Sequence, residues 1–191
     1  MRLSGKVALV TGAADERSIG WGIVKALADE GVDVIVNDIT LPDQLEKRVA
    51  ELQALGRRGL AIQADVTKAD EVEAMMERAV AEMGRLDIVC SNAGIIRWEP
   101  FLEVTARELQ AVVNVNIMGN VHMCQSSARQ MIKQGQGGRI IITSSVQSEI
   151  QFPITPIYGG TKFAMHTFVG CLALELAEYN ITVNHLGPGW V

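Results

Sequence analysis

Short runs of aliphatic and β-branched residues alternate with longer amphipathic stretches along the chain, and this alternation constrains the fold most. Six runs are nearly continuous in Val, Ile, Leu and Ala, as strands covered on both faces are; they are 7–11, 32–37, 59–64, 86–91, 139–143 and 181–186. Helical periodicity marks the stretches between them, at 20–30, 42–55, 68–83, 106–133 and 158–178. Strands joined by right-handed helical crossovers form a parallel, doubly wound α/β sheet.

The expected helix ends carry recognisable signals. Thr67 and Thr105 each precede an acidic residue by three positions, the pattern of a capping box that opens a helix. Three amphipathic stretches are followed by a glycine, at positions 31, 56 and 84, where helices commonly end. The stretch 106–133 is long for one helix, so a bend is expected within it.

Length and charge bound the class of protein. No linker interrupts the alternation over 191 residues, so a single domain, 1–191, is predicted. The 17 basic and 22 acidic side chains leave a net charge of −5, which argues against nucleic acid or an anionic membrane as the main partner. Membrane helices need about 18 consecutive apolar residues, and the sequence has no such stretch. The opening residues also lack the apolar core of a signal peptide.

Cysteine and histidine usage gives no sign of a metal or a disulfide framework. Cys90, Cys124 and Cys171 are far apart, odd in number and without zinc-site spacing. The histidines have no mutual metal-ligand spacing either. We therefore expect no metal centre, a reducing cytoplasmic location, and cysteines buried as thiols.

The first strand leads into a loop suited to a nucleotide, because ligands of a doubly wound sheet bind beyond the carboxyl ends of its strands. The loop opens at Gly12 and ends at Ser18, Ile19 and Gly20, directly before a helix. Backbone N–H groups and a helix N-terminus in such a turn can hold a pyrophosphate. The usual G-x-x-x-G-x-G is altered here, since the loop is two residues longer and Ser18 stands at the second glycine. An ordinary strand–helix turn is the alternative.

Asp38 ends the second strand at a position where a carboxylate can accept hydrogen bonds from the adenosine ribose. Its charge would repel the 2′-phosphate of NADP, whereas Arg17 in the loop could pair with that phosphate. We expect Asp38 to dominate and NAD to be the cofactor, with NADP as the alternative. A solvated turn aspartate is the other interpretation of Asp38.

Two further strand ends are suited to the same ligand. Asp65 and Val66 end the third run, while Asn92, Ala93 and Gly94 follow the fourth. All five are placed to border the adenine or the ribose, and the small residues let backbone approach a flat ring closely. Singly, such residues belong to turns more often than to ligand sites.

Tyr158 and Lys162 lie four residues apart at the start of an expected helix, and therefore share a helix face. An ammonium beside a phenol favours the phenolate, so the pKa of Tyr158 is expected to fall toward neutrality, where it can serve as an acid–base. Ser145 ends the fifth strand, from which its hydroxyl could polarise a substrate oxygen. Asn116 lies inside the long helical stretch, where an amide competes with the backbone and can bend the helix or hold a water.

The order and spacing of these residues resemble the main branch of the short-chain dehydrogenase/reductase family. The similarity spans essentially the whole chain and adds an Asn-x-x-x-Pro-Gly motif that ends at Pro188 and Gly189. The resemblance implies a Rossmann-type sheet of strand order 3-2-1-4-5-6 and a catalytic tetrad. The implied tetrad is Asn116, Ser145, Tyr158 and Lys162. The resemblance also implies that Lys162 holds the nicotinamide ribose, that Asn116 supports a proton-relay water, and that the Pro-Gly pair lines the nicotinamide pocket.

Some positions depart from the family pattern. The long, glycine-poor loop resembles the enoyl-reductase branch, but that branch spaces its Tyr and Lys differently, so a carbonyl/alcohol reaction is favoured. Ser148 and Glu149 follow the catalytic serine in place of small residues and predict a more polar substrate pocket. The family's last strand, substrate-covering segment and C-terminal interface are expected beyond Val191.

The function expected is reversible hydride transfer between NAD, or NADP, and a secondary alcohol or ketone, such as a sugar, polyol or 3-oxoacyl compound. A dinucleotide-binding sensor or scaffold without turnover is the alternative from another class, and an NAD-using epimerase or dehydratase is a third. The resemblance also implies a homodimer or homotetramer formed through helix 158–178. The apolar face proposed for that contact comprises Phe163, Phe168, Leu172 and Leu176.

Overall fold

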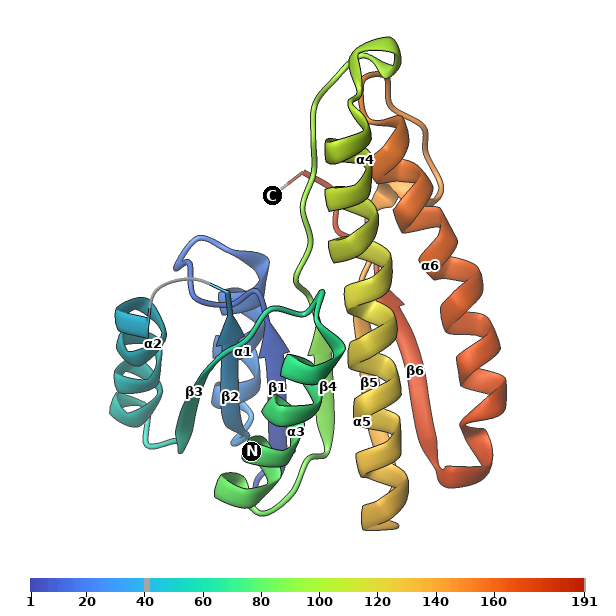
Figure 1. The fold of residues 1–191 in the computed structure, drawn as a ribbon. Coiled ribbons are helices and arrows are strands. Elements are labelled where there is room, and N and C mark those ends of the chain that lie inside the picture. Colours follow the sequence, from blue (N-terminus) through green and yellow to red (C-terminus); the bar gives the residue numbers. More distant parts are fainter. Residues whose placement is uncertain (40–41, 191) are drawn as a thin grey trace.

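A six-stranded parallel sheet forms the centre of the molecule in the computed structural model, which describes residues 1–39 and 42–190 (Figure 1). The order β3-β2-β1-β4-β5-β6 confirms the predicted topology. The strands are β1 (Val7–Thr11), β2 (Asp33–Asp38), β3 (Gly59–Gln63), β4 (Ile88–Ser91), β5 (Gly138–Thr143) and β6 (Ile181–Leu186).

Strand β1 lies at the centre because both of its faces are apolar. All five of its residues are buried. Leu9 pairs in register with Ile35 of β2 on one side and with Val89 of β4 on the other. Burial on both faces explains why the run is continuously aliphatic instead of alternating with polar residues.

Helices cover both faces of the sheet (Figure 1). Trp21 and Val24 of α1, with Leu45 of α2, pack against one face, whereas Met75 of α3, Met123 of α5 and Val169 of α6 belong to the core cluster on the other. The helices are α1 (Ile19–Asp29), α2 (Pro42–Ala54), α3 (Ala69–Met83), α4 (Ala106–Val113), α5 (Asn120–Gln134) and α6 (Pro156–Glu175).

Helix boundaries confirm some of the predicted signals. The capping box of α4 is present, with the Thr105 hydroxyl and the Glu108 side chain each bonded to the other's backbone. Gly84 ends α3 in the left-handed region at φ 84°. The capping box predicted at Thr67 is wrong, because its backbone N–H and its hydroxyl both donate to Asp65 Oδ1. That local turn engages the threonine, and α3 begins without a side-chain cap.

The long helical stretch changes its hydrogen-bonding pattern where Asn116 lies, at the place where a bend was expected. Helices α4 and α5 are joined by a π-helical segment, Asn114–Gly119. The backbone N–H of Asn120 bonds to the Ile117 carbonyl, while its side-chain Nδ2 donates to the Asn116 carbonyl at 2.7 Å. A π-helical turn of this kind is rare and occurs often at functional sites.

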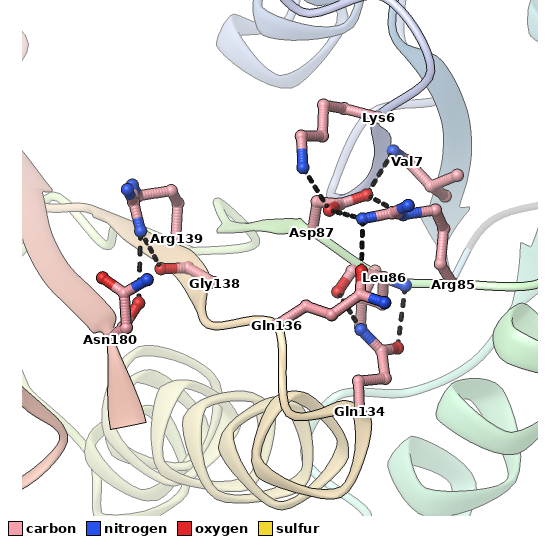
Figure 2. A network of polar contacts seen from close by, with 10 residues as sticks. All are labelled: Lys6, Val7, Arg85, Leu86, Asp87, Gln134, Gln136, Gly138, Arg139 and Asn180. Carbon is pink, nitrogen blue, oxygen red and sulfur yellow. Dashed lines mark hydrogen bonds and ion pairs between the residues drawn. The ribbon is translucent and has the colours of Figure 1, made fainter. Parts of the chain in front are cut away.

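A polar network ties the sheet together at its amino edge (Figure 2). Asp87 accepts hydrogen bonds from Val7 N–H at 3.0 Å, from Lys6 Nζ at 2.9 Å and from the Arg85 guanidinium at 2.6 and 2.7 Å. Burial works to raise the pKa of Asp87, but these donors outweigh it and hold that pKa below its usual value. Gln134 adds a second link, since its side-chain amide bonds to both backbone groups of Leu86.

The cysteines follow the prediction only in part. Cys90 and Cys124 are buried, and burial raises the pKa of each thiol to about 12. Cys171 is exposed, contrary to expectation, because it lies on the outward side of α6. Among the described residues, none of the helices has the length and apolarity to cross a membrane.

Candidate active site

A cavity of about 550 Å³ opens at the carboxyl edge of the sheet, within the size range of small-molecule sites. Segments that follow all six strands contribute to it, as the fold predicts. Most of the predicted site residues line it: Gly12, Ser18, Ile19, Asp38, Asp65, Val66, Asn92, Ala93, Gly94, Ser145, Tyr158, Lys162, Pro188 and Gly189.

Three predicted residues lie outside that lining. Arg17 is exposed and its Nε lies 3.7 Å from Asp15 Oδ1, away from the cavity wall. Gly20 lies underneath the loop, and Asn116 is fully buried behind Gly94. Gly20 and Asn116 therefore contact site residues from behind the cavity wall.

The loop after β1 needs glycine at two positions for close packing. Gly12 has a φ of +64°, and a side chain there would meet Ala93 Cα at 2.9 Å. A Cβ on Gly20 would lie 2.7 Å from Asn92 Nδ2 and would clash with the Gly12 carbonyl. Glycine at both positions lets the loop pack closely against Asn92 and Ala93, and this packing sets the shape of the cradle that would hold a pyrophosphate.

Ser18 takes the place of the second glycine as the N-cap of α1. Its Oγ accepts from Trp21 N–H at 3.0 Å and donates to the Asp15 carbonyl at 2.8 Å. The serine thus stabilises both the longer loop and the first turn of the helix. The first-turn N–H groups of α1 then face the cradle, the usual position for an anionic group.

Asn92 joins three strands through its side chain. Its Nδ2 donates to the Thr11 carbonyl at 2.9 Å and its Oδ1 accepts from the Thr143 hydroxyl at 3.0 Å. The Thr11 hydroxyl also accepts from the backbone of Asn92 and Ala93. Asn92 therefore holds β1, β4 and β5 at a fixed spacing beneath the ligand, in addition to its place on the cavity wall.

The end of β2 offers acceptors for an adenosine. Asp38 Oδ2 accepts from Ala14 N–H at 3.0 Å, which holds the carboxylate against the loop after β1. Neighbouring Asn37 lines the cavity, donates from Nδ2 to the carbonyls of Ile62 and Ala64, and has a buried Oδ1 without a partner in the described structure. An unpaired buried acceptor is costly, so a ligand donor at this end would stabilise it.

Asp65 and Val66 are held by local contacts. Asp65 Oδ1 accepts from the backbone and hydroxyl of Thr67. The Val66 carbonyl lies 3.1 Å from His122 Nδ1, and a Cβ on Gly119 would meet Val66 Cγ2 at 2.9 Å. Gly119 of the π-helical segment and His122 of α5 thus approach the segment after β3 and position this wall of the cavity.

Ser145, Tyr158 and Lys162 meet at the other end of the cavity. Ser145 is the N-cap of a short 3₁₀ turn, where its Oγ accepts from Gln147 N–H at 3.2 Å. Val146 N–H donates to the Pro188 carbonyl at 3.0 Å, which places the Pro188-Gly189 segment beside the serine. Lys162 is 3% exposed, and its Nζ donates to the Thr143 carbonyl at 2.8 Å.

The expected shift of the Tyr158 pKa is wrong for the free protein. Burial raises the pKa of Tyr158, although its hydrogen bond with Ser145 acts in the opposite direction. Lys162 Nζ lies 5.4 Å from the centroid of the Tyr158 ring and bonds to Thr143 instead. Burial also lowers the pKa of Lys162 to about 8, so its positive charge is itself disfavoured.

Asn116 connects the π-helical segment between α4 and α5 to the loop after β4. Its Oδ1 accepts from Ile95 N–H and its Nδ2 donates to the Ile95 carbonyl, both at 2.9 Å. Nδ2 also lies 3.2 Å from the Thr161 hydroxyl, one residue before Lys162. A Cβ on Gly94 would lie 3.4 Å from both Asn116 Oδ1 and Lys162 Nζ. The amide thus fixes the space between the loop and the lysine.

Several lining residues were missed by sequence reasoning. Thr143, Ser144 and Asn37 are polar residues at the ends of apolar strands, and this position is a signal that could have identified them. The apolar residues among the missed ones carry no comparable signal. The remaining missed residues that line the cavity are Ile39, Ala64, Ile95, Ile96 and Val115.

The fold and cavity together define a dinucleotide-binding protein of the doubly wound α/β class. The chain matches the short chain dehydrogenase family model over residues 6–191 and belongs to that family. It is thereby an NAD(P)-dependent oxidoreductase that acts on an alcohol or ketone, as predicted.

Individual relatives share most of the chain. Versicolorin reductase stcU of Emericella nidulans is 42% identical over 98% of this chain and 70% of its own length. The 2-dehydro-3-deoxy-D-gluconate 5-dehydrogenase of Escherichia coli is 38% identical over 99% of this chain and 73% of its own. The structure of an NAD⁺-bound xylitol dehydrogenase superposes with a TM-score of 0.94 at 32% identity, covering all of this chain and 72% of that one.

Proposed function

We propose that Tyr158 is the acid–base of the reaction and that Ser145, Lys162 and Asn116 complete the catalytic group. The observation that carries this proposal is the convergence of Ser145, Tyr158 and Lys162 on one wall of a cavity whose other end is formed by the glycine-bearing loop and Asp38. A dinucleotide along this cavity would bring its nicotinamide to the tyrosine. The nicotinamide supplies or accepts the hydride when bound.

Ser145 is suited to hold the substrate oxygen. Its Oγ accepts a backbone hydrogen bond from Gln147, which leaves the hydroxyl proton available as a donor. Ser145 and Tyr158 both line the cavity, and the Ser145 hydroxyl acts to lower the pKa of Tyr158. In the reductive direction Tyr158 donates its proton to the carbonyl oxygen, and in the oxidative direction it takes the proton of the alcohol.

Lys162 holds the ribose and adjusts the acidity of Tyr158. Because Nζ donates to Thr143 at the bottom of the cavity, its remaining protons are available to ribose hydroxyls. Asn116 acts as the positioning residue for this lysine through Thr161, and for the loop after β4 through Ile95. Asn116 is also the residue proposed to support a proton-relay water.

Asp38 is proposed to select NAD over NADP. Its carboxylate is held at the end of the cavity by Ala14 N–H, at the place expected for the adenosine ribose. A 2′-phosphate there would meet a like charge at short range. Arg17 pairs with Asp15 outside the cavity, which supports Asp38 as the deciding residue.

The proposed assembly is a homodimer or homotetramer through α6, but of the predicted apolar face only Phe163 is available for that contact. Leu176 is buried, and Phe168 and Leu172 pack against the core on the sheet side. Phe163 and Leu174 point outward, 61% and 83% exposed. Exposed apolar side chains on one helix suit a contact between copies; light scattering of wild type and Leu174→Asp would test it.

The experiment that tests the function measures NADH formation from NAD, and NADPH formation from NADP, with a panel of secondary alcohols. We expect NADH release with a preference for NAD in kcat/KM. A tenfold preference for NADP would contradict the role of Asp38 and favour Arg17. Cofactor binding without release of reduced nicotinamide with any alcohol would instead favour the sensor or the epimerase and dehydratase alternatives.

A further inference from the structure

Three aromatic side chains from three separate segments meet next to residues that line the cavity. The rings of Trp98 and Trp190 stack with centroids 5.6 Å apart and an interplanar angle of 18°. Phe152 lies edge-on to Trp190, with centroids 6.1 Å apart at 85°. In Figure 1 the C-terminal segment passes beside the loop between β4 and α4. We call Trp98, Phe152 and Trp190 the aromatic corner.

The aromatic corner adjoins the reacting end of the cavity. Trp98 lies two residues beyond Ile96, and Trp190 directly follows Gly189; both Ile96 and Gly189 line the cavity. Phe152 lies on the loop that joins Ser145 to Tyr158. The corner is thus built from the three segments that surround the proposed acid–base.

Backbone hydrogen bonds hold these loops at a fixed spacing. Glu99 N–H donates to the Ile154 carbonyl at 2.9 Å, next to Trp98 on one side and near Phe152 on the other. Val146 N–H donates to the Pro188 carbonyl at 3.0 Å, which ties the Trp190 segment to the Ser145 loop. The rings therefore share a supported frame with the catalytic serine.

Much of the ring surface faces solvent. Trp98 is 47% exposed and Trp190 is 75% exposed. Large apolar rings gathered in water at the rim of a cavity mark a contact surface. A nearly parallel indole pair presents a flat face, and Phe152 supplies a perpendicular wall.

Two polar residues of the same segments bond to the backbone. Ser148, expected to make the pocket more polar, is buried and donates its hydroxyl to the Ser145 carbonyl at 2.7 Å. Arg97 donates from Nη1 to the Ile96 carbonyl at 3.0 Å. An indole accepts no hydrogen bond, so a substrate rich in hydroxyls would bury them against these rings at a cost.

We propose that the aromatic corner binds the body of the substrate and selects alcohols and ketones carried on a flat aromatic ring system. The proposal rests on the proposed function, because it assumes that the reacting carbon lies at Ser145 and Tyr158. The substrate ring stacks on the indoles, and its attached carbinol or carbonyl carbon reaches the two hydroxyls. Trp98 and Trp190 are then specificity-determining residues.

The test compares 1-tetralol, whose carbinol is part of a fused aromatic ring system, with cyclohexanol, which lacks the aromatic ring. The variants are Trp98→Leu and Trp190→Leu, with Trp98→Phe as the conservative variant. Leu55→Ala, at an exposed position that follows α2 and does not line the cavity, is the control. Each Leu variant should lower kcat/KM for 1-tetralol by about fivefold to tenfold, mainly through KM. Cyclohexanol should change less than about twofold, Trp98→Phe should retain most of the preference, and the control should behave as wild type.

A binding measurement separates failure of this proposal from failure of the proposed function. Tryptophan fluorescence is titrated with 1-tetralone in the presence of NAD, which cannot reduce the ketone, in wild type and in Trp98→Phe, where Trp190 and buried Trp21 remain. We expect quenching that weakens in the variant whether or not turnover occurs. If both alcohols lose kcat/KM equally, if neither does, or if 1-tetralone quenches no more than cyclohexanone, the selective role of the aromatic corner is wrong.

Discussion

Lys162 donates from Nζ to the carbonyl oxygen of Thr143 across 2.8 Å, so the buried ammonium is held by the end of β5 instead of by the phenol of Tyr158. The Tyr-x-x-x-Lys spacing suggests a direct contact between the ammonium and the phenol, whereas the ammonium bonds to the Thr143 carbonyl. Both side chains are desolvated, and under the proposed function the ribose hydroxyls of a bound cofactor would join them. This relationship leads to the first prediction.

Lys162→Met should stabilise the free protein at neutral pH. Burial lowers the folded pKa of Lys162 to about 8, so carrying the charge at pH 7 costs the folded state about 3 kcal/mol. As pH rises from 8 through the unfolded pKa near ~10.4, this cost disappears and wild type gains stability. Urea unfolding at pH 7 and pH 10 should show the advantage of the variant shrinking. A constant advantage at both pH values would contradict the assigned cause.

Tyr158→Phe should abolish turnover and leave cofactor binding nearly intact. The ring still packs, and only the transferable proton is lost, so kcat should fall by about a thousandfold. The chain offers a matched control in its other tyrosine, Tyr179, which is 42% exposed and lies away from the cavity. Rates of NADH release together with NADH fluorescence titrations separate the two effects. Similar kcat values for Tyr158→Phe and wild type would remove this residue from the acid–base role.

Asp38→Asn should weaken the preference for NAD by raising kcat/KM with NADP. Removal of one negative charge at the ribose end relieves repulsion of about 1 kcal/mol or more, equivalent to roughly fivefold to tenfold in the NADP/NAD ratio. Asp43→Asn, an exposed acid in the first turn of α2, serves as the charge-matched control. Both cofactors are measured with the same alcohol. An unchanged ratio in Asp38→Asn would show that selection lies elsewhere.

Gly20→Ala should impair cofactor binding, whereas Gly22→Ala in the same helix should not. A Cβ at Gly20 would press on Asn92 Nδ2 at 2.7 Å and distort the loop after β1, while a Cβ at Gly22 meets open space. Alanine at Gly22 should stabilise the helix by about 0.5–1 kcal/mol. Dissociation constants for NADH and thermal unfolding of both variants provide the comparison. Equal NADH affinity in the two variants would contradict the cradle role of Gly20.

Asp87→Asn should destabilise the protein without changing KM. The carboxylate bonds to Val7, Lys6 and Arg85, and its loss should cost about 2 kcal/mol. Because the folded pKa of Asp87 is lowered, the stabilisation is complete above the unfolded pKa near ~3.9 and is lost as pH falls through the folded value. The difference in free energy of unfolding between wild type and Asp87→Asn should therefore be smaller at pH 3 than at pH 7. A difference that persists at the lower pH would oppose this origin.

The parallel sheet could be predicted because β1 and its neighbouring strands are continuously aliphatic, which leaves little choice of topology. Site residues next to strand ends, such as Asp38 and Ser145, are predictable for the same reason. The pKa direction of Tyr158 was not, because desolvation depends on packing that spacing does not reveal. The capping box at Thr67 failed because Asp65, two residues earlier, competes for the same hydroxyl.

The contacts of the aromatic corner also lie beyond sequence reasoning. Trp98 and Trp190 are separated by most of the second half of the chain, and no periodicity indicates that their rings stack. Likewise, Asn37 ends a strand like any buried polar residue, and only the structure shows that its Oδ1 lacks a partner among the described residues. Such properties arise from the meeting of loops, each of which has an unremarkable local pattern.

Asp87 lies at the amino edge of the sheet, so the contacts that stabilise the fold there are remote from the residues proposed for catalysis, and this is useful for redesign. The charged anchor holds the starts of β1 and β4, while the reacting groups follow the opposite ends of the strands. A library confined to the loop positions around Trp98, Phe152 and Trp190 therefore leaves the anchor untouched. Such a library can explore new substrates from a scaffold whose tolerance to mutation is set at the far end of the same strands.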